Sequence, residues 1–311
     1  MEIDFKKLVW GTLIAMLPIV ASAIDDGPRM YWNGPVDTNI LQTYYWTVHG
    51  NNVTPEGTQP NNNFETDISL GILAYNRIFD LAGHAMILTG VMTAGNISGT
   101  ISTPINSTAR SSRGLGDLYL QGVVNLFGAP ALNAEEFASY KQGTVLSLLV
   151  GMTAPTGDYE NGRALNMGAN RWNTRIGLPF MQTLGDWIPG EITTLEILPS
   201  VWFYGDNDDY TSLGLDLKQD PMYTLEAHLT RDITTSLFVS LDYFVQRIGD
   251  SYINDIQTGV ANTSDSLGLT FGYMLNAQTQ FQLRYAATLN PDPAENELDA
   301  SIFQFNLNYF W

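Results

Sequence analysis

The sequence predicts an all-β fold: a transmembrane antiparallel up-and-down β-barrel of about 12 strands, with long extracellular loops and a short periplasmic helix. Three observations predict it. Apolar and polar residues alternate with a period of two along most of the chain, long and short connections alternate, and the N-terminus has the order of a secretory signal. These observations predict two parts of the chain, a signal peptide over 1–23 and an outer-membrane barrel domain over 24–311.

The N-terminus resembles an export signal in charge and hydropathy. Lys6 and Lys7 precede "LVWGTLIAMLPIV" and then "ASA", the order of a charged, an apolar and a small-residue region. We expect cleavage after Ala23 and export to the bacterial outer membrane. Glu2 and Asp4 make the charged region less basic than usual, and a retained anchor is the alternative.

The predicted strands follow one another along the mature chain. Each is near the length of about ten residues that a tilted strand needs to cross a bilayer. An exported β-sandwich or a soluble barrel remains the alternative fold. The segments lie near 38–49, 64–77, 84–95, 114–127, 142–155, 172–184, 191–204, 222–232, 236–248, 264–275, 278–288 and 301–311.

Alternation predicts which side chains face lipid. In "DISLGILAY" the apolar residues Ile68, Leu70 and Ile72 alternate with polar or small ones. We expect that apolar set to face lipid and Asp67 to face the lumen.

The last strand, "SIFQFNLNYFW", alternates up to the final residue. Its amides Gln304, Asn306 and Asn308 are expected to face water. The aromatic end resembles the signal by which the barrel-assembly machinery recognises outer-membrane barrels. The predicted assembly signal comprises Phe303, Phe305, Leu307, Tyr309 and Trp311.

Connection lengths predict the topology. Long polar connections such as "TGDYENGRALNMGANR" and "YGDNDDYTSLGLDLKQDP" follow the odd-numbered segments, and short ones such as "DITTS" follow the even-numbered ones. Outer-membrane barrels have long outward loops and short periplasmic turns. The exception, "GAPALNAEEFASYK", has helical spacing and predicts a short periplasmic helix.

Composition excludes several functions. The formal charge of −18 disfavours nucleic acid as a partner, because phosphate binding depends on Lys and Arg. The absence of cysteine removes thiolate catalysis and Cys-based metal sites. His49, His84 and His228 lack a flanking G-x-S-x-G motif, so we expect no enzyme and no catalytic residue. Glu226 and His228 lie two apart on one strand without further histidines, so we expect no metal site, and no cofactor is expected.

A barrel of this size has a narrow lumen that inward side chains can gate. Inward carboxylates opposite Arg284, and also Arg175, would form a hydrogen-bonded network, and inward aromatic rings would offer stacking surfaces. The alternative is that these groups only satisfy one another and stiffen the wall. The candidates for contact with a permeant are Tyr119, Glu196, Trp202, Glu226, His228, Asp242 and Arg284.

The glycine-rich segment "TGDYENGRALNMGANRW" follows the fifth strand. It either folds into the mouth as a constriction or forms a loose external loop. Asn170, Arg171 and Trp172 are the constriction candidates.

Several motifs together resemble one family. They include "GPRMYWNGP", "GLGDLYL", "NLFGAPALNAEEFASYKQGTVL", "APTGDYENGRALNMGANRW", "VWFYGDNDDY" and "KQDPMYTLEAHL". In order and spacing they resemble the outer-membrane family named after the meta-cleavage pathway of phenol degradation. The resemblance implies a barrel that passes small hydrophobic or aromatic solutes, with outer-membrane lipid around it. A general porin, a structural or adhesive barrel and an enzyme at the membrane rim remain alternatives.

Overall fold

The computed structural model describes residues 17–18, 26–51, 64–103, 106–163, 165–291 and 298–311. The predicted signal peptide therefore lies outside the described residues except for Leu17–Pro18, and so do the predicted loops at 52–63 and 292–297. No helix in the described part of the chain is long and apolar enough to cross a bilayer.

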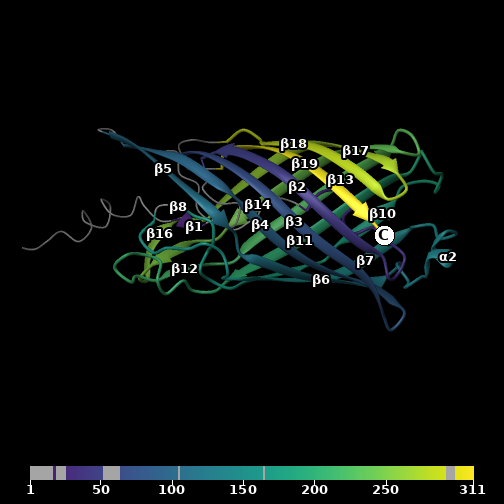
Figure 1. The fold of residues 1–311 in the computed structure, drawn as a ribbon, viewed down its shortest axis with the longest axis horizontal. Coiled ribbons are helices and arrows are strands. Elements are labelled where there is room, and N and C mark those ends of the chain that lie inside the picture. The colour runs from purple at the N-terminus through teal and green to yellow at the C-terminus, as the bar shows by residue number, and fades with distance from the viewer. Residues whose placement is uncertain (1–16, 19–25, 52–63, 104–105, 164, 292–297) are drawn as a thin grey trace, which may run out of the picture.

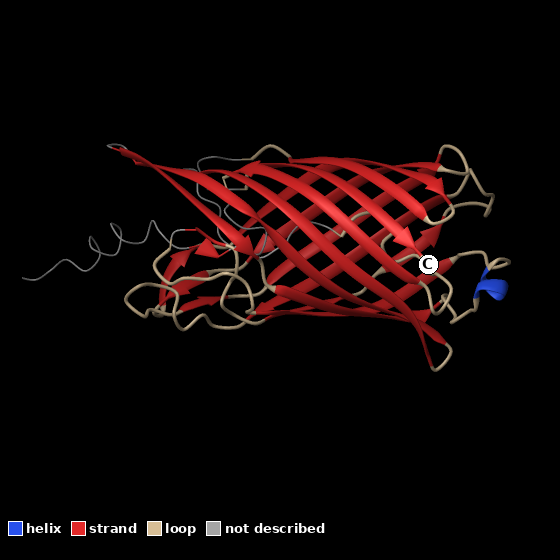
Figure 2. Cartoon of the chain, viewed as in Figure 1, coloured by secondary structure: helices blue, strands red, loops and turns tan. Residues whose placement is uncertain are grey.

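The chain forms a closed antiparallel barrel of 12 wall strands, which confirms the predicted fold class (Figures 1 and 2). Neighbouring strands in the sequence are neighbours in the wall, and the last strand pairs with the first. The wall strands are β2 (Asn39–Gly50), β3 (Phe64–Leu81), β4 (His84–Thr103), β6 (Leu118–Phe127), β7 (Thr144–Ala154), β9 (Asn173–Gly177) continued by β10 (Phe180–Thr183), β11 (Thr193–Tyr204), β13 (Met222–Asp232), β14 (Leu237–Ile248), β17 (Asn262–Asn276), β18 (Thr279–Thr288) and β19 (Ala300–Phe310).

One predicted strand, 172–184, is broken in the structure. β9 and β10 each pair with both β7 and β11, and Leu178 and Pro179 separate them. Pro179 has no N–H to donate to the ladder. Its carbonyl instead accepts from the Ser147 N–H at 2.8 Å, and Leu178 donates to the Pro199 carbonyl at 3.1 Å.

The long connections gather at one end of the barrel, together with β5 and two small sheets (Figure 1). The predicted polar loop after β4 is instead a hairpin, because β5 (Asn106–Leu115) pairs with β4; the predicted strand 114–127 begins only at Leu118. The small sheets contain β12 (Leu217–Gln219), β15 (Ser251–Ile253) and β16 (Ile256–Gly259), and β1 (Leu17–Pro18) with β8 (Leu165–Asn166).

The opposite end carries the predicted short helix, α2 (Ala134–Phe137). The Asn133 side chain accepts from the backbone N–H groups of Glu135 and Glu136, and the Glu136 carboxylate accepts from the Asn133 N–H. This reciprocal capping explains why a helix forms here despite its short length.

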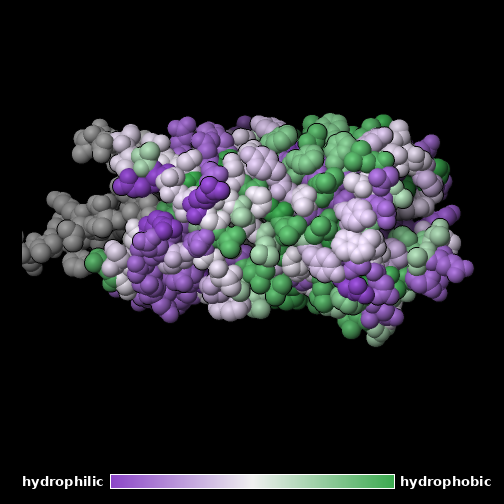
Figure 3. Space-filling view, in the orientation of Figure 1, coloured by the Kyte–Doolittle hydropathy of each residue, from purple (hydrophilic) through white to green (hydrophobic). Residues whose placement is uncertain are grey.

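Exposed apolar residues cover the outside of the wall strands, and hydrophilic residues gather at the loop end, over β12 and β16 (Figure 3). Outward-facing apolar residues include Leu73, Met92, Leu120, Val150, Leu269 and Phe271. This apolar belt between two polar ends is the outer surface that a bilayer requires.

The predicted facing of β3 is wrong. Ile68, Leu70 and Ile72 are buried inside the barrel, whereas Asp67 lies on the exposed outer face and pairs with His49 at 2.9 Å. The strand carries apolar residues on both faces, since Leu73 and Tyr75 face outward. Part of the inner wall is therefore apolar. The prediction had assumed that all residues facing the lumen are polar and all residues facing lipid are apolar.

The first and last strands close the wall at the C-terminus. Asn39 and Trp311 exchange backbone hydrogen bonds of 2.9 and 3.0 Å. The predicted assembly residues Phe303, Phe305, Leu307, Tyr309 and Trp311 all face outward. The Trp311 ring lies 5.6 Å from the Tyr309 ring and 6.3 Å from the Tyr75 ring, so the last residue belongs to an aromatic cluster on the outer face.

Replacing Trp311 with aspartate is expected to reduce assembly in the membrane. The change puts a charge where an aromatic ring contacts two others, and it alters the end of the closing strand. The measurement is heat-modifiable migration of the protein from outer-membrane fractions. Leu213→Asp, at an exposed loop position, is the control. A fully heat-modifiable Trp311→Asp variant at normal abundance would contradict the prediction.

Candidate functional site in the barrel lumen

Arg175 on β9 is at the centre of the charged side of the lumen. Its guanidinium donates from Nη2 to Glu226 Oε1 at 2.7 Å, from Nη1 to Asp26 Oδ2 at 2.8 Å, and from Nε to Ser200 Oγ at 3.2 Å. Arg175 is 3% exposed and Glu226 2%. A buried charge persists when it is both paired and hydrogen-bonded, and Arg175 satisfies both conditions.

A second charged cluster lies on β13, β14 and β18. His228 Nδ1 lies 2.8 Å from Asp242 Oδ1, and the Arg284 Nε lies 3.5 Å from Asp242 Oδ2. The hydroxyls of Ser240 and Thr270 donate to the same carboxylate at 2.6 and 2.5 Å. These groups line one side of the lumen and hold Asp242 from strands β13, β14, β17 and β18.

The segment 26–38, which precedes β2, lies inside the barrel against this charged side. The Asp26 N–H donates to Glu226 Oε2 at 2.8 Å, and the Arg29 N–H donates to Glu196 Oε2 at 2.8 Å. Trp32 Nε1 donates to the other oxygen of Glu196 at 3.0 Å. Two wall carboxylates therefore bind the main chain of the N-terminal segment directly.

Side chains of the N-terminal segment add to its attachment. Arg29 Nη2 lies 2.6 Å from Asp232 Oδ1, and its guanidinium lies over the rings of Trp32 and Phe238 at 4.3 and 4.0 Å. Burial lowers the pKa of Arg29, and Asp232 opposes that shift. Burial also raises the pKa of Tyr31 well above its usual value, so its hydroxyl stays protonated and donates to the Asp26 carboxylate.

The opposite side of the lumen is apolar. It is formed by β2, β3, β4 and β6, whose buried side chains point inward. The residues that form this apolar wall include Trp46, Ile72, Ile87 and Val123, with Val91 partly buried among them.

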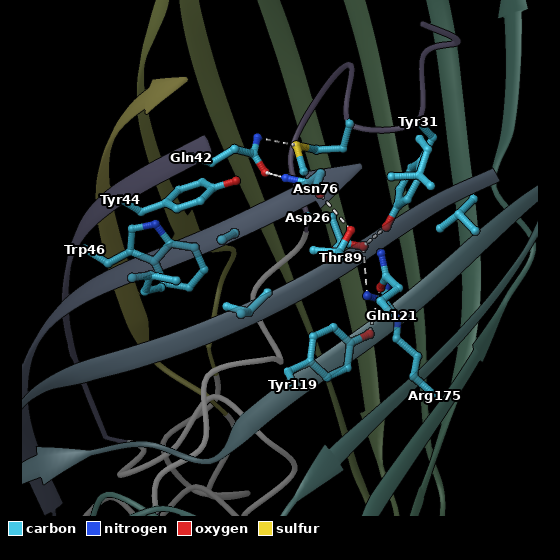
Figure 4. A pocket seen from close by; sticks show the side chains of 16 residues that line it. Asp26, Tyr31, Gln42, Tyr44, Trp46, Asn76, Thr89, Tyr119, Gln121 and Arg175 are labelled. Carbon is cyan, nitrogen blue, oxygen red and sulfur yellow. Dashed lines mark hydrogen bonds and ion pairs between the residues drawn. The ribbon is translucent and has the colours of Figure 1, made fainter. Parts of the chain in front are cut away.

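A cavity lies between the N-terminal segment and the apolar wall (Figure 4). Asp26, Tyr31 and Arg175 border it on one side, and Tyr44 and Trp46 border it on the other. The cavity is thus an amphipathic space in mid-lumen, with an aromatic and aliphatic surface facing a charged one.

A row of neutral hydrogen-bonding groups crosses the wall at the level of the cavity. The Thr89 hydroxyl donates to Asn76 Oδ1 at 2.7 Å, and Asn76 Nδ2 donates to Gln42 Oε1 at 2.8 Å. On the next strand the Tyr119 hydroxyl donates to Gln121 Oε1 at 2.7 Å. The cavity therefore has polar groups without net charge on its apolar side.

The side chains of Tyr119 on β6 and Trp202 on β11 pack in one cluster on the inner face. Their ring centroids are 6.2 Å apart, and the Arg175 guanidinium lies 5.1 Å from the Trp202 ring. The Tyr119 ring lies directly over Gly151, where a Cβ atom would fall 2.1 Å from the Tyr119 hydroxyl oxygen. Glycine at this position therefore allows the ring to lie flat on the wall and leaves the lumen wider.

The glycine-rich segment after β7 folds inward over the mouth. The Asp117 carboxylate accepts from the N–H groups of Thr156, Gly157 and Ala169 at 2.9, 2.6 and 2.8 Å. Burial raises the pKa of Asp117, although these three donors favour its charged form. Leu165 and Met167 are buried against the apolar wall, so this segment packs inside the barrel rather than extending away from it.

The three constriction candidates have different positions. Arg171 is 2% exposed, donates to Gln219 Oε1 at 2.7 Å and lies 4.5 Å over the Tyr204 ring. Asn170 has a φ of 54° and donates to Asn207 Oδ1 at 2.9 Å, which anchors the segment. Trp172, in contrast, is 53% exposed.

All seven predicted permeant-contact residues are buried on the inner face: Tyr119, Glu196, Trp202, Glu226, His228, Asp242 and Arg284. Only Tyr119 among them lines the cavity. The sequence placed Arg175 in the inner network of carboxylates, but it did not reveal the N-terminal segment that Arg175 binds or the apolar wall. The motif "GPRMYWNGP" was the available signal, because arginine and tryptophan are unusual in a simple linker.

Comparisons with known proteins show which sequences and structures this barrel is similar to. The family model for the "MetA-pathway of phenol degradation" matches residues 47–295. The crystal structure of an outer membrane channel from Pseudomonas putida F1 superposes with a TM-score of 0.76 at 19% identity, covering 92% of this chain and 100% of that one. The transport unit of the autotransporter AIDA-I from Escherichia coli gives a TM-score of 0.54 at 8% identity, covering 98% and 97%. No curated protein sequence matches. At these identities the two structures support the outer-membrane barrel fold alone.

Proposed function

The chain belongs to the MetA-pathway phenol-degradation family, and from this premise we propose that it is an outer-membrane channel giving small hydrophobic or aromatic compounds a passive diffusion path. The proposal combines family membership with the chemistry of the lumen. It requires no catalytic step and no cofactor.

The apolar inner wall carries the proposal. A channel for hydrophilic solutes keeps a polar, water-filled interior. Here Ile72, Ile87 and Val123 form a surface inside the barrel that water solvates poorly, and an aromatic or aliphatic solute would cover it. Burial of apolar surface on that wall would favour entry of such solutes over sugars.

A general porin and a structural or adhesive barrel are the other candidate functions. The N-terminal segment and the folded mouth segment leave little room for bulk water, which disfavours a general porin. A purely structural barrel has no need of a cavity lined on one side by apolar groups. The channel is therefore the function that the lumen supports best.

We also propose that the chain is exported by cleavage after Ala23 and inserted by the barrel-assembly machinery. The charged, apolar and small-residue order of the first 23 residues supports export. The outward-facing aromatic residues of β19 support recognition during insertion.

A bulky residue in the cavity is expected to slow uptake. Ala74 faces the cavity, and the neighbouring Leu73 faces lipid. Ala74→Trp should reduce the initial uptake rate of labelled p-cresol by cells several-fold, because the indole would fill the path, while Leu73→Trp should not change it. Cells with the intact lipopolysaccharide layer are needed, because p-cresol crosses plain phospholipid unaided.

Arabinose uptake and heat-modifiable migration serve as controls in the same cells. Unchanged arabinose uptake would separate the proposed channel from a general porin. Equal p-cresol uptake with and without the protein would reject the channel altogether. Equal uptake by properly folded Ala74→Trp and wild-type barrels would place the path outside this cavity.

A further inference from the structure

We propose that the lumen cavity is a binding site for uncharged apolar molecules that carry a hydroxyl group, such as phenols, and that it discriminates against aromatic carboxylates. This inference rests on the proposed channel function and specifies the chemical class of its solute. Two observations support it: some polar atoms around the cavity lack hydrogen-bond partners, and the charged groups beside the cavity are already paired.

Three polar atoms around the cavity lack a hydrogen-bond partner. Among the described residues, none bonds the Tyr44 hydroxyl, Trp46 Nε1 or Gln121 Nε2. Gln121 uses its carbonyl oxygen to accept from Tyr119, which leaves its amide N–H groups for another acceptor. Trp46 Nε1 is a buried donor without a partner, which is costly, and a ligand oxygen would remove that cost.

The geometry of these atoms suits a single hydroxyl on a flat body. Tyr44 and Trp46 lie close together on β2, with ring centroids 6.0 Å apart and nearly perpendicular planes. Figure 4 shows both side chains on one side of the cavity and Tyr119 with Gln121 on another. A hydroxyl both donates and accepts, so it can pair with the Tyr44 oxygen and with an N–H group of Trp46 or Gln121.

Charge disfavours a carboxylate in the same place. Arg175 is the only cation among the described residues that line the cavity, and its charge is already paired with the carboxylates of Asp26 and Glu226. The Asp26 carboxylate itself borders the cavity. A carboxylate ligand would lose its hydration beside a like charge without gaining a cation, which is unfavourable.

The test is calorimetric titration of the detergent-solubilised full chain with p-cresol, p-toluate and toluene, which share one ring and differ in one group. We expect p-cresol to bind at least about tenfold more tightly than p-toluate. Gln121→Leu and Tyr44→Phe should each weaken p-cresol binding by about tenfold or less, as for one lost hydrogen bond, and leave toluene binding unchanged.

The matched control is Gln246→Leu, the same substitution at a buried inward position on β14 that does not line the cavity. It should leave p-cresol binding unchanged. Toluate binding as tight as p-cresol binding, or p-cresol binding that neither Gln121→Leu nor Tyr44→Phe alters, would overturn the inference. If uptake still depended on Ala74 in that case, the channel would stand with a different solute class. If none of the three compounds bound and uptake was also absent, both proposals would fall.

Discussion

Replacing Arg175 with leucine is expected to lower the free energy of unfolding by about 3–5 kcal/mol. Arg175 neutralises Glu226, which is only 2% exposed, and it also pairs with Asp26 of the N-terminal segment. Without the guanidinium, both carboxylates stay in a lumen largely closed to water. The loss comes from these uncompensated charges more than from the missing contacts.

A double variant separates the two causes. Arg175→Leu combined with Glu226→Leu removes both members of the buried pair, so it should recover much of the stability lost in the single variant. The measurement is urea unfolding in micelles, followed by tryptophan fluorescence. Arg77→Leu, whose pairing with Asp37 is half exposed, is the control and should cost less than about 1 kcal/mol. A single-variant loss as small as that of the control would refute the prediction.

Deleting Asp26–Asn33 is expected to raise single-channel conductance several-fold. This segment occupies the charged side of the lumen, and four of its donors bind Glu196, Glu226 and Asp232. Its removal would leave a wider path lined by carboxylates, which attract cations. The measurement is conductance in planar bilayers, with the residues up to Asp25 retained for processing.

Two comparisons make this result specific. Trp32→Ala removes one donor to Glu196 and should give more frequent opening with little change in the main conductance. Trimming Thr211–Leu213 from an external loop should change neither the opening frequency nor the main conductance. An unchanged conductance after the deletion would mean that the mouth segment, held by Asp117, limits the pore instead.

The wall strands were predictable because a lipid-facing surface imposes a period of two on every strand. Most charged residues predicted to face inward were also placed on the correct face, with Asp67 on β3 as the exception. A charged side chain is costly in the lipid that surrounds the barrel. Glu226, His228 and Arg284 were therefore expected to face inward, as they do.

The facing of β3 was not predictable by the same rule. Ile72 faces the lumen and Leu73 faces lipid, so hydropathy does not distinguish the two sides of this strand. The N-terminal segment was missed for a different reason. Its attachment depends on Glu196 and Glu226, which are more than 150 residues away in sequence, and no local periodicity reports such contacts.

The attachment of the N-terminal segment also has a consequence for the order of folding. Asp26 reaches Glu226 across 200 residues of sequence, and Arg29 reaches Glu196 across 167. These acceptors exist as a site only after β11 and β13 have paired and the wall has curved into a cylinder. Contacts of such long sequence separation form late because the intervening chain must be ordered first. The wall of the barrel thus forms before the N-terminal segment settles inside it, so residues near the start of the barrel domain are among the last to find their native contacts.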